Sequence, residues 1–316
     1  MNFDLSEEQI AFQNLAKEFA RKDLAPFAAT WDSESYFPKE VIQKAGELGF
    51  CSLYVPEEDG GMNLGRLDAS IIIEQLSAGC TSTTAFITIH NMALWMLSKF
   101  GKEKLKKEWC PSLSSGKKLA SYCLTESGAG SDAASIKTTA KKINDSYIIN
   151  GSKSFISGSG ETDCLILMAR TGKEGAGGVS CFLIPANSKG IDYGKKEEKM
   201  GWKNQPTRIV NLNEVKVPMD NLIGEEGQGF KIAMQGLDGG RINIATCSIG
   251  TAQAALSAAQ QYMNEREQFG KKIGEFQALQ FKLADMATEL VAARHFVRLA
   301  ANKLDDNHPE ATIYSA

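Results

Sequence analysis

The hydrophobic period of this chain changes twice along its length, and these changes constrain the fold more than any other feature. From Ser6 to about residue 116, apolar residues recur at intervals of three and four, which is typical of amphipathic helices. From about 120 to 224 the period is two, in short runs separated by turn residues, and from about 227 the helical period returns. Helices, then strands, then helices favour an α+β fold with domains in series over an alternating α/β fold.

We therefore expect an N-terminal helical domain over 1–119, a middle antiparallel β-barrel or sandwich domain over 120–225, and a C-terminal helical bundle over 226–316. Ser6 and Gln9 predict a capping box at the start of the first helix. Small residues such as Gly250, on a helix expected over 230–262, would let another helix approach closely. Asn150 and Gly151 predict a turn between two short strands. Residues 309–316 begin a further helix without an end signal, so we expect the bundle to be incomplete.

Composition and charge exclude several classes of function. The 316 residues carry a net charge of −3, so no basic surface for a nucleic acid is expected. No apolar run reaches the roughly 18 residues that span a membrane, and the acidic N-terminus lacks the pattern of a signal or transit peptide. We expect no integral membrane segment, and a location in a bacterial cytoplasm or, for a mature eukaryotic form, in the mitochondrial matrix.

The metal-binding residue types are dispersed along the chain. The seven cysteines are odd in number and contain no CxxC pair, which indicates reduced cysteines that act as small apolar side chains. The three histidines are too scattered to suggest a set of metal ligands. We expect no metal site.

The segment 122–132, YCLTESGAGSD, is the most specific motif. A glycine-rich loop leaves backbone N–H groups free to meet an anionic or carbonyl-rich ligand, although a short GAG run alone would more often be a surface turn. The whole segment resembles the YC-x-TEPG-x-GSD signature of acyl-CoA dehydrogenases, in which this loop lies against FAD. By this resemblance the cofactor-binding residues of the loop are Tyr122, Leu124, Thr125, Gly130 and Ser131, and Ser131 also faces the substrate. Ser127 stands where the family usually carries Pro, which loosens the loop slightly.

A second motif, GSKSFIS at 151–157, resembles the family's strand in which an aromatic residue covers the flavin and a hydroxyl residue bonds the ring edge. It adds Phe155, Ile156 and Ser157 to the expected cofactor site. Most members have Trp where this chain has Phe155, which alone would more often be an ordinary core residue of a strand. Together with GSGE at 158–161, HNM at 90–92 and GGRINIA at 239–245, Phe155 is more like the branch of the family that acts on isobutyryl-CoA.

Two downstream motifs extend the resemblance. Within LDGGR at 237–241, Asp238 and Arg241 match residues near the acyl-CoA, and the alternative for each is a capping or ion-pairing residue. The segment REQFG at 266–270 resembles the R-x-x-FG motif, whose Arg reaches the pyrophosphate of a neighbouring subunit's FAD, and a guanidinium suits a diphosphate. This adds Arg266, Gln268, Phe269 and Gln277 to the cofactor site and implies a homotetramer with flavin sites shared between subunits.

The acyl pocket is expected on a buried helix. By alignment with the family, Thr84, Thr88 and Met92 line it at i, i+4 and i+8 spacing, while periodicity alone would explain them equally well as helix-packing core.

The family's reaction removes an α-proton from an acyl-CoA while a β-hydride passes to the flavin, so the site needs a positioned base. In most members the base is a late Glu, and in a minority it precedes the Arg of the Asp-x-x-Arg motif, where this chain has Gly240. Glu126 and Glu265, the carboxylates nearest to the motifs, are better interpreted as structural. We therefore expect the catalytic Glu beyond Ala316, and negligible turnover from these 316 residues.

The resemblance implies an FAD-dependent dehydrogenase of a short branched-chain acyl-CoA, such as isobutyryl-CoA, that passes electrons to an electron-transfer flavoprotein. An acyl-CoA oxidase and a dehydrogenase of short straight chains are the alternatives among enzymes. A non-catalytic acyl-CoA- or flavin-binding homologue is the alternative of another class.

Overall fold

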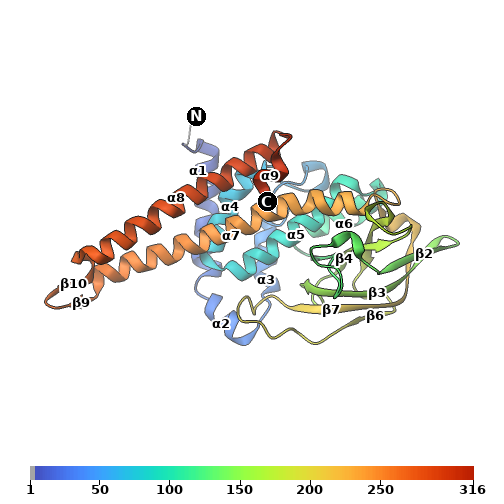
Figure 1. Cartoon of the computed structure of the whole chain (residues 1–316), viewed down its shortest axis with the longest axis horizontal. Coiled ribbons are helices and arrows are strands. Elements are labelled where there is room, and N and C mark those ends of the chain that lie inside the picture. Colours follow the sequence, from blue (N-terminus) through green and yellow to red (C-terminus); the bar gives the residue numbers. More distant parts are fainter. Residues whose placement is uncertain (1–3) are drawn as a thin grey trace. The chain divides into compact units, whose positions relative to one another are not determined.

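The computed structural model describes residues 4–316; residues 1–3, which include Phe3 at the start of the resemblance, lie outside the described residues. The chain divides into two compact units (Figure 1). The first, which we call the helical unit, consists of residues 4–29, Gly65–Ala85 and Arg241–Ala316. The second, the sheet unit, consists of Thr30–Leu64 and Phe86–Gly240.

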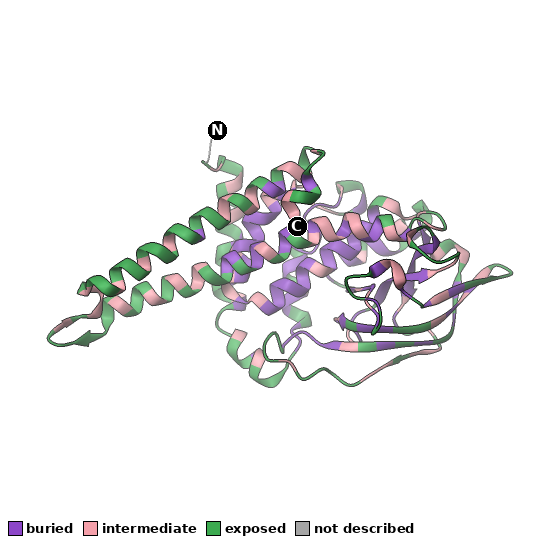
Figure 2. Ribbon diagram, in the orientation of Figure 1, coloured by how far each residue is buried: buried purple, intermediate pink, exposed green. Residues whose placement is uncertain are grey.

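The helical unit is formed by α1 (Glu7–Phe19), a π-helical turn η1 (Ala20–Leu24), α4 (Arg66–Gly79), most of α7 (Gly229–Glu265), α8 (Gln277–Asp305) and α9 (Ala311–Ser315). The predicted capping box is confirmed, because the Ser6 side chain accepts from the Gln9 backbone and the Gln9 side chain accepts from the Ser6 backbone. Between α7 and α8 the chain turns through two short strands, β9 (Glu267–Gln268) and β10 (Lys271–Lys272). Figure 2 shows the ends of α7 and α8 next to this turn as mostly exposed.

Close helix packing in this unit depends on Gly250 of α7. A Cβ at this position would lie 2.1 Å from Ser77 Oγ and 2.2 Å from the backbone oxygen of Glu74, both on α4. Such distances are far inside van der Waals contact, so only glycine fits. The expected role of the small residues of α7 is confirmed at this position.

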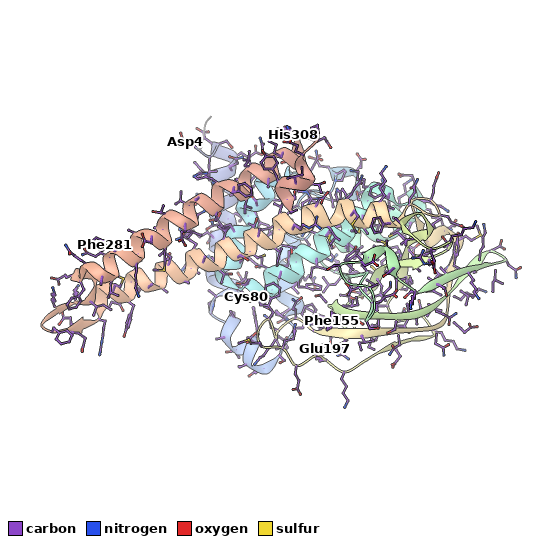
Figure 3. All side chains as sticks on the ribbon, in the orientation of Figure 1. Asp4, Cys80, Phe155, Glu197, Phe281 and His308 are labelled. Carbon is purple, nitrogen blue, oxygen red and sulfur yellow. The ribbon has the colours of Figure 1, made fainter. Side chains whose placement is uncertain are left out.

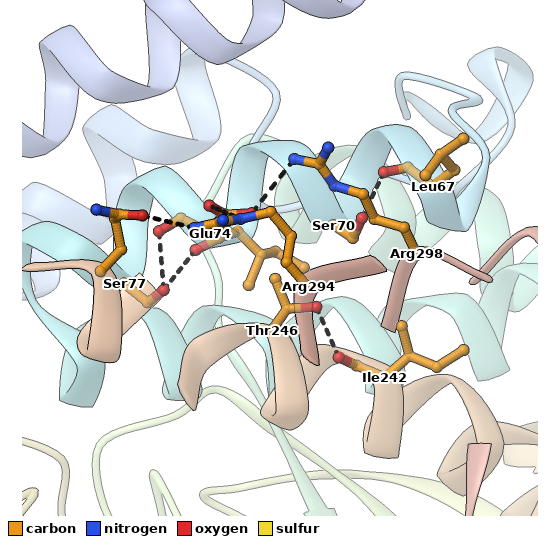
Figure 4. Close-up of polar contacts among 10 residues, drawn as sticks. Leu67, Ser70, Glu74, Ser77, Ile242, Thr246, Arg294 and Arg298 are labelled. Atoms are coloured by element: carbon orange, nitrogen blue, oxygen red, sulfur yellow. Dashed lines mark hydrogen bonds and ion pairs between the residues drawn. The ribbon is translucent and has the colours of Figure 1, made fainter. Parts of the chain in front are cut away.

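An ion-pair network joins α4 to α8 in the same unit (Figure 4). Glu74 is buried, and its carboxylate accepts from Arg294 Nε at 2.9 Å and from Arg298 Nη2 at 3.4 Å. Arg294 also donates to the Gln253 side chain of α7 at 2.7 Å. One carboxylate therefore holds α4 and α8 together, and α7 is tied in through an amide.

The helices of the sheet unit are α2 (Ala28–Glu34), α3 (Lys39–Glu47), the 3-10 turn η2 (Glu57–Asp59), α5 (Thr81–Phe100) from Phe86 onward, α6 (Glu103–Ser114), and the start of α7 up to Gly240. Helices α5 and α7 thus contribute residues to both units. No helix of the described chain combines the length and the hydropathy needed to cross a membrane.

The eight strands of this unit form one sheet in the order β6-β7-β3-β2-β4-β5-β8, with β1 paired to β4. Their bounds are β1 (Ala120–Cys123), β2 (Thr139–Ile143), β3 (Ser146–Ser157), β4 (Cys164–Arg170), β5 (Val179–Pro185), β6 (Ile191–Tyr193), β7 (Thr207–Pro218) and β8 (Leu222–Ile223). Short 3-10 turns lie between them: η3 (Ala133–Ser135), η4 (Ala176–Gly178) and η5 (Met219–Asn221). Most pairs are antiparallel, as expected, but β1 and β2 both pair with β4 in parallel.

The predicted architecture of helices, sheet and helices is confirmed, with a sheet that is mixed and, over the described strands, open rather than closed into a barrel. Strand β4 is buried on both faces: Cys164, Ile166 and Met168 belong to one core cluster, and the alternating Leu165 and Leu167 to another. A strand that is covered on both faces needs apolar residues at successive positions, which explains the apolar run Cys164–Ala169.

The prediction of a turn at Asn150–Gly151 is wrong. Both residues lie inside the long strand β3, where its register against β7 shifts between Ile149 and Gly151. The extra residue is on β7, and Glu214 there has φ of 54°. A Cβ on Gly151 would lie 2.5 Å from Thr138 Oγ1, so this glycine serves a close approach instead of a turn.

Candidate active site

The glycine-rich segment follows β1 at the point where the chain leaves the sheet. Glu126 and Ala129 exchange two backbone hydrogen bonds, of 3.2 and 3.1 Å, which close a tight turn with Ser127 and Gly128 at its tip. Ser127, Gly128, Gly130 and Ser131 are exposed. A Cβ built on Gly128 or Gly130 would meet nothing within 4 Å, so the space in front of this backbone is open.

A buried ion pair lies behind the turn. Lys153 of β3 is fully buried, and its Nζ lies 2.8 Å from Glu126 Oε1 and donates to the backbone oxygen of Leu124 at 3.0 Å. Glu126 also accepts from the backbone N–H groups of Lys137, at 2.6 Å, and Thr138, at 3.0 Å. Burial lowers the pKa of Lys153, and Glu126 opposes this. Burial alone would raise the pKa of Glu126, but the Lys153 charge and the backbone donors outweigh it and lower that pKa.

Phe155 is turned outward by a bulge two residues beyond Lys153. Between Lys153 and Ile156 strand β3 contains one residue more than β7, and Phe155 takes up a φ of 59°. Its side chain is 67% exposed, while Ser154 and Ile156 on either side are buried (Figure 3). A positive φ is costly for a bulky residue, and such conformations concentrate at functional sites.

The bulge and the turn are tied to one another and to β1. The backbone N–H of Ser154 donates to the backbone oxygen of Thr125 at 2.8 Å. The Ser121 hydroxyl donates to the backbone oxygen of Ser157 at 2.7 Å. These bonds connect the two segments that the motifs assign to the cofactor, the first with Leu124, Thr125, Gly130 and Ser131 and the second with Phe155, Ile156 and Ser157.

Tyr122 differs from the other members of this group. Its half-buried ring packs on the core, and its hydroxyl is buried without a hydrogen-bond partner among residues 4–316. Burial raises the pKa of this hydroxyl. A contact of Tyr122 with a cofactor would therefore involve its backbone or ring. The other residues fit FAD, because open glycine backbone beside an exposed aromatic ring suits a planar, phosphorylated ligand.

The second expected group lies at the tip of the α7–α8 hairpin in the helical unit. Arg266, Gln268, Phe269 and Gln277 are all exposed, and Phe269 is 93% exposed. Phe269 and Gly270 both have positive φ, as the central residues of a two-residue hairpin turn of type I′ require. The Arg266 guanidinium has no hydrogen bond or ion pair within residues 4–316, so it is available for an anion.

The expected acyl-pocket residues are buried along α5. The Thr84 hydroxyl donates to the backbone oxygen of Cys80 at 2.8 Å, and Thr88 lies one turn further along the helix. Met92 belongs to the core cluster of the sheet unit. Its Sδ lies 3.1 Å from the position of a Cβ on Gly240 of α7. On α7, Asp238 is half-buried and Arg241 is exposed.

Glu126 and Glu265, the carboxylates nearest to the motifs in the sequence, both have hydrogen-bond partners within the chain. Glu126 is engaged by Lys153 and two backbone amides, as described above. Glu265 is the exposed last residue of α7 and accepts from the Gln261 side chain at 2.8 Å. Gly240 offers no side chain. The Lys153–Glu126 ion pair was not predicted from the sequence, because its two residues lie 27 positions apart and no local pattern connects them.

Comparisons with known proteins agree with the motifs. Three family models match the chain: the N-terminal domain of acyl-CoA dehydrogenase over residues 6–117, the middle domain over 121–215 and the C-terminal domain over 227–316. The mitochondrial isobutyryl-CoA dehydrogenase of Dictyostelium discoideum is 52% identical over 99% of this chain, which spans 75% of that relative's length.

Solved structures give the same result for the fold. The butyryl-CoA dehydrogenase of Megasphaera elsdenii superposes with a TM-score of 0.95 at 38% identity, over 100% of this chain and 84% of that one. The structure described as PigA with FAD and proline superposes with a TM-score of 0.95 at 31% identity, over 100% of this chain and 84% of that one.

Proposed function

The chain belongs to the acyl-CoA dehydrogenase family, and on that premise we propose that it dehydrogenates a short branched-chain acyl-CoA, with isobutyryl-CoA as first choice. The family makes it an oxidoreductase with FAD as its cofactor. The observation that carries the choice of substrate is the 52% identity to an isobutyryl-CoA dehydrogenase over 99% of the chain. Phe155, in the position where most of the family has Trp, supports the same branch.

The proposed roles of the residues follow from their positions. FAD, when bound, accepts the β-hydride. Leu124, Thr125 and Gly130 would meet the flavin through backbone groups, and the exposed Phe155 ring would cover it. Arg266, at the exposed hairpin tip, would bind the pyrophosphate of a neighbouring subunit's cofactor through its planar fork of donors. This sharing of sites is the reason to propose a homotetramer.

We propose that no carboxylate among these 316 residues is the catalytic base. Glu126 is buried in an ion pair, Glu265 ends a helix at the surface, and Gly240 occupies the alternative position. A base must lie within hydrogen-bond reach of the α-proton and must be free to accept it. The base would then be a Glu that lies beyond Ala316.

Asp238 and Arg241 would contact the CoA part of the substrate, and Ser131 would contact the substrate beside the flavin. Thr84, Thr88 and Met92 would form the wall around the acyl group. An electron-transfer flavoprotein is the proposed acceptor of the electrons. The word mitochondrial in the names of relatives supports a matrix location for a eukaryotic form, with the cytoplasm proposed for a bacterial one.

A second candidate substrate is a short straight-chain acyl-CoA. It is favoured by the TM-score of 0.95 to a butyryl-CoA dehydrogenase. An acyl-CoA oxidase would use the same residues and would differ in releasing peroxide during turnover.

The test is turnover with isobutyryl-CoA and butyryl-CoA, using a dye acceptor, for the 316-residue chain and for any longer product of its gene. We expect a higher kcat/KM for isobutyryl-CoA, no peroxide, and activity only in a product that carries the additional Glu. Normal turnover by the 316-residue chain would contradict the proposal about the base. Preference for butyryl-CoA would favour the second candidate.

A further inference from the structure

The ion pair between Lys153 and Glu126 joins three separate stretches of backbone at one buried point. Lys153 Nζ donates to the Leu124 carbonyl and to Glu126, and Glu126 accepts from the amides of Lys137 and Thr138. The Lys153 side chain is fully buried, and that of Glu126 is 9% exposed. The turn, the stretch after η3 and strand β3 are therefore fixed to one another through these two side chains.

A contribution to the stability of the fold does not by itself explain why these two charged side chains are buried. Burying two charges costs desolvation energy, and apolar side chains of similar volume often stabilise a protein as well or better. Apolar side chains could not donate to the Leu124 carbonyl or accept from two amides. What the pair supplies is a defined geometry of the backbone around it.

The ion pair fixes the backbone next to Thr125 and Phe155, which are both expected to contact the flavin. Thr125 lies between the two anchored residues Leu124 and Glu126, and its carbonyl accepts from Ser154. Phe155 follows Ser154 in the bulge and has its strained positive φ. The spacing between the Thr125 backbone and the exposed Phe155 ring is thus set by the residues next to them, which the ion pair holds.

We propose that Lys153 and Glu126 are positioning residues for the flavin: without touching it or the substrate, they set the distance between the turn 124–131 and the Phe155 ring. This inference rests on the proposed cofactor contacts of those two segments. It deepens the proposed function by assigning cofactor affinity and the flavin's electronic environment to a buried pair behind the site.

The test compares the buried Lys153–Glu126 pair with a second, largely buried lysine–carboxylate pair of the same unit. Lys153→Met keeps an unbranched side chain that is one atom shorter and removes its charge. The matched control is Lys106→Met: Lys106 Nζ, on α6, lies 3.3 Å from Asp59 Oδ2 in η2, and these side chains are 12% and 8% exposed. Each protein is freed of flavin and titrated with FAD, and the dissociation constant, the position of the flavin absorption band and the midpoint potential are measured. Thermal unfolding of the flavin-free form reports the purely structural cost.

We expect Lys153→Met to weaken FAD binding by about tenfold or more and to shift the band and the potential, because charge-assisted hydrogen bonds are lost behind the site. Lys106→Met should lower the melting temperature and leave the FAD constants within about twofold. Equal changes in the two variants, or an FAD affinity of Lys153→Met within about twofold of the wild type, would overturn the inference.

A second variant covers the case in which Lys153→Met does not fold because Glu126 is left buried without its partner. The double variant Lys153→Met with Glu126→Gln carries no buried charge, and we expect it to fold and to show the same loss of FAD affinity and the same band shift. Wild-type FAD binding by this double variant would overturn the inference. A wild-type chain that binds no FAD at all would overturn the proposed function together with the inference, so the two failures are distinguishable.

Discussion

His90 should make the fold less stable in acid. This residue of α5 is fully buried, with its Nε2 donating to the Leu113 backbone oxygen at 3.0 Å and its Nδ1 accepting from the Ala120 backbone N–H at 3.1 Å. Only the neutral ring with its proton on Nε2 satisfies both partners. Burial lowers the pKa of His90 from the ordinary 6.5 to about 4.

The sign of the effect follows from proton binding. Between pH 6.5 and about 4, His90 takes up a proton in the unfolded chain and stays neutral in the folded one. The unfolded state therefore binds more protons in this window, and the free energy of unfolding falls as the pH falls. The difference between the two pKa values corresponds to a loss on the order of 3 kcal/mol by pH 4.

The perturbation is His90→Gln, which keeps hydrogen-bonding capacity and removes the titration. At neutral pH we expect it to cost about 1–3 kcal/mol, because the amide cannot serve both backbone partners. The assay is denaturant unfolding from neutral pH down to about 4, with the wild type and the variant compared at each pH. As the pH falls through this window the wild type should lose about 3 kcal/mol more than the variant, so the stability gap between them should close or reverse by about pH 4. Parallel curves for the two proteins would refute the reasoning.

Three further changes test other parts of the structure. Gly250→Ala should destabilise the helical unit by about 1–3 kcal/mol in thermal unfolding, because the new Cβ meets α4 backbone, and an unchanged melting temperature would contradict the close packing. Glu74→Ala should cost about 3–5 kcal/mol, since it leaves Arg294 and Arg298 without their shared carboxylate, and a loss below about 1 kcal/mol would show that solvent serves them equally well. Phe155→Ala should change stability by less than about 0.5 kcal/mol, because the ring is 67% exposed, while weakening FAD binding in a fluorescence titration; unchanged FAD binding would remove Phe155 from the site.

Local signals in the sequence predicted the helices and the order of the layers. The capping box of Ser6 and Gln9 is a contact across three residues, and the period of the apolar side chains is itself a property of one helix or strand. The parallel pairing of β1 with β4 was not predicted, because it joins residues more than 40 positions apart. Asn150–Gly151 was mistaken for a turn because Asn-Gly is a strong turn signal, whereas in this strand the glycine permits a close approach to Thr138.

The candidate site was predicted by motif matches, and its physical basis was not. Thr125 and Phe155 were assigned from resemblance alone, and the structure brings their segments together through Ser154. A lysine in a strand is ordinarily read as solvent-facing, so the burial of Lys153 could be recognised only once Glu126 was known to be its partner.

The proposed function requires this chain to bind FAD and a short branched acyl-CoA in one site. Its most direct test is an anaerobic titration of the FAD-reconstituted protein with isobutyryl-CoA, followed through the flavin absorption band, with butyryl-CoA and a long-chain acyl-CoA alongside. We expect a saturable shift of the band that occurs at the lowest concentration with isobutyryl-CoA. A bound flavin whose spectrum ignores isobutyryl-CoA, or responds more readily to the long chain, would contradict it.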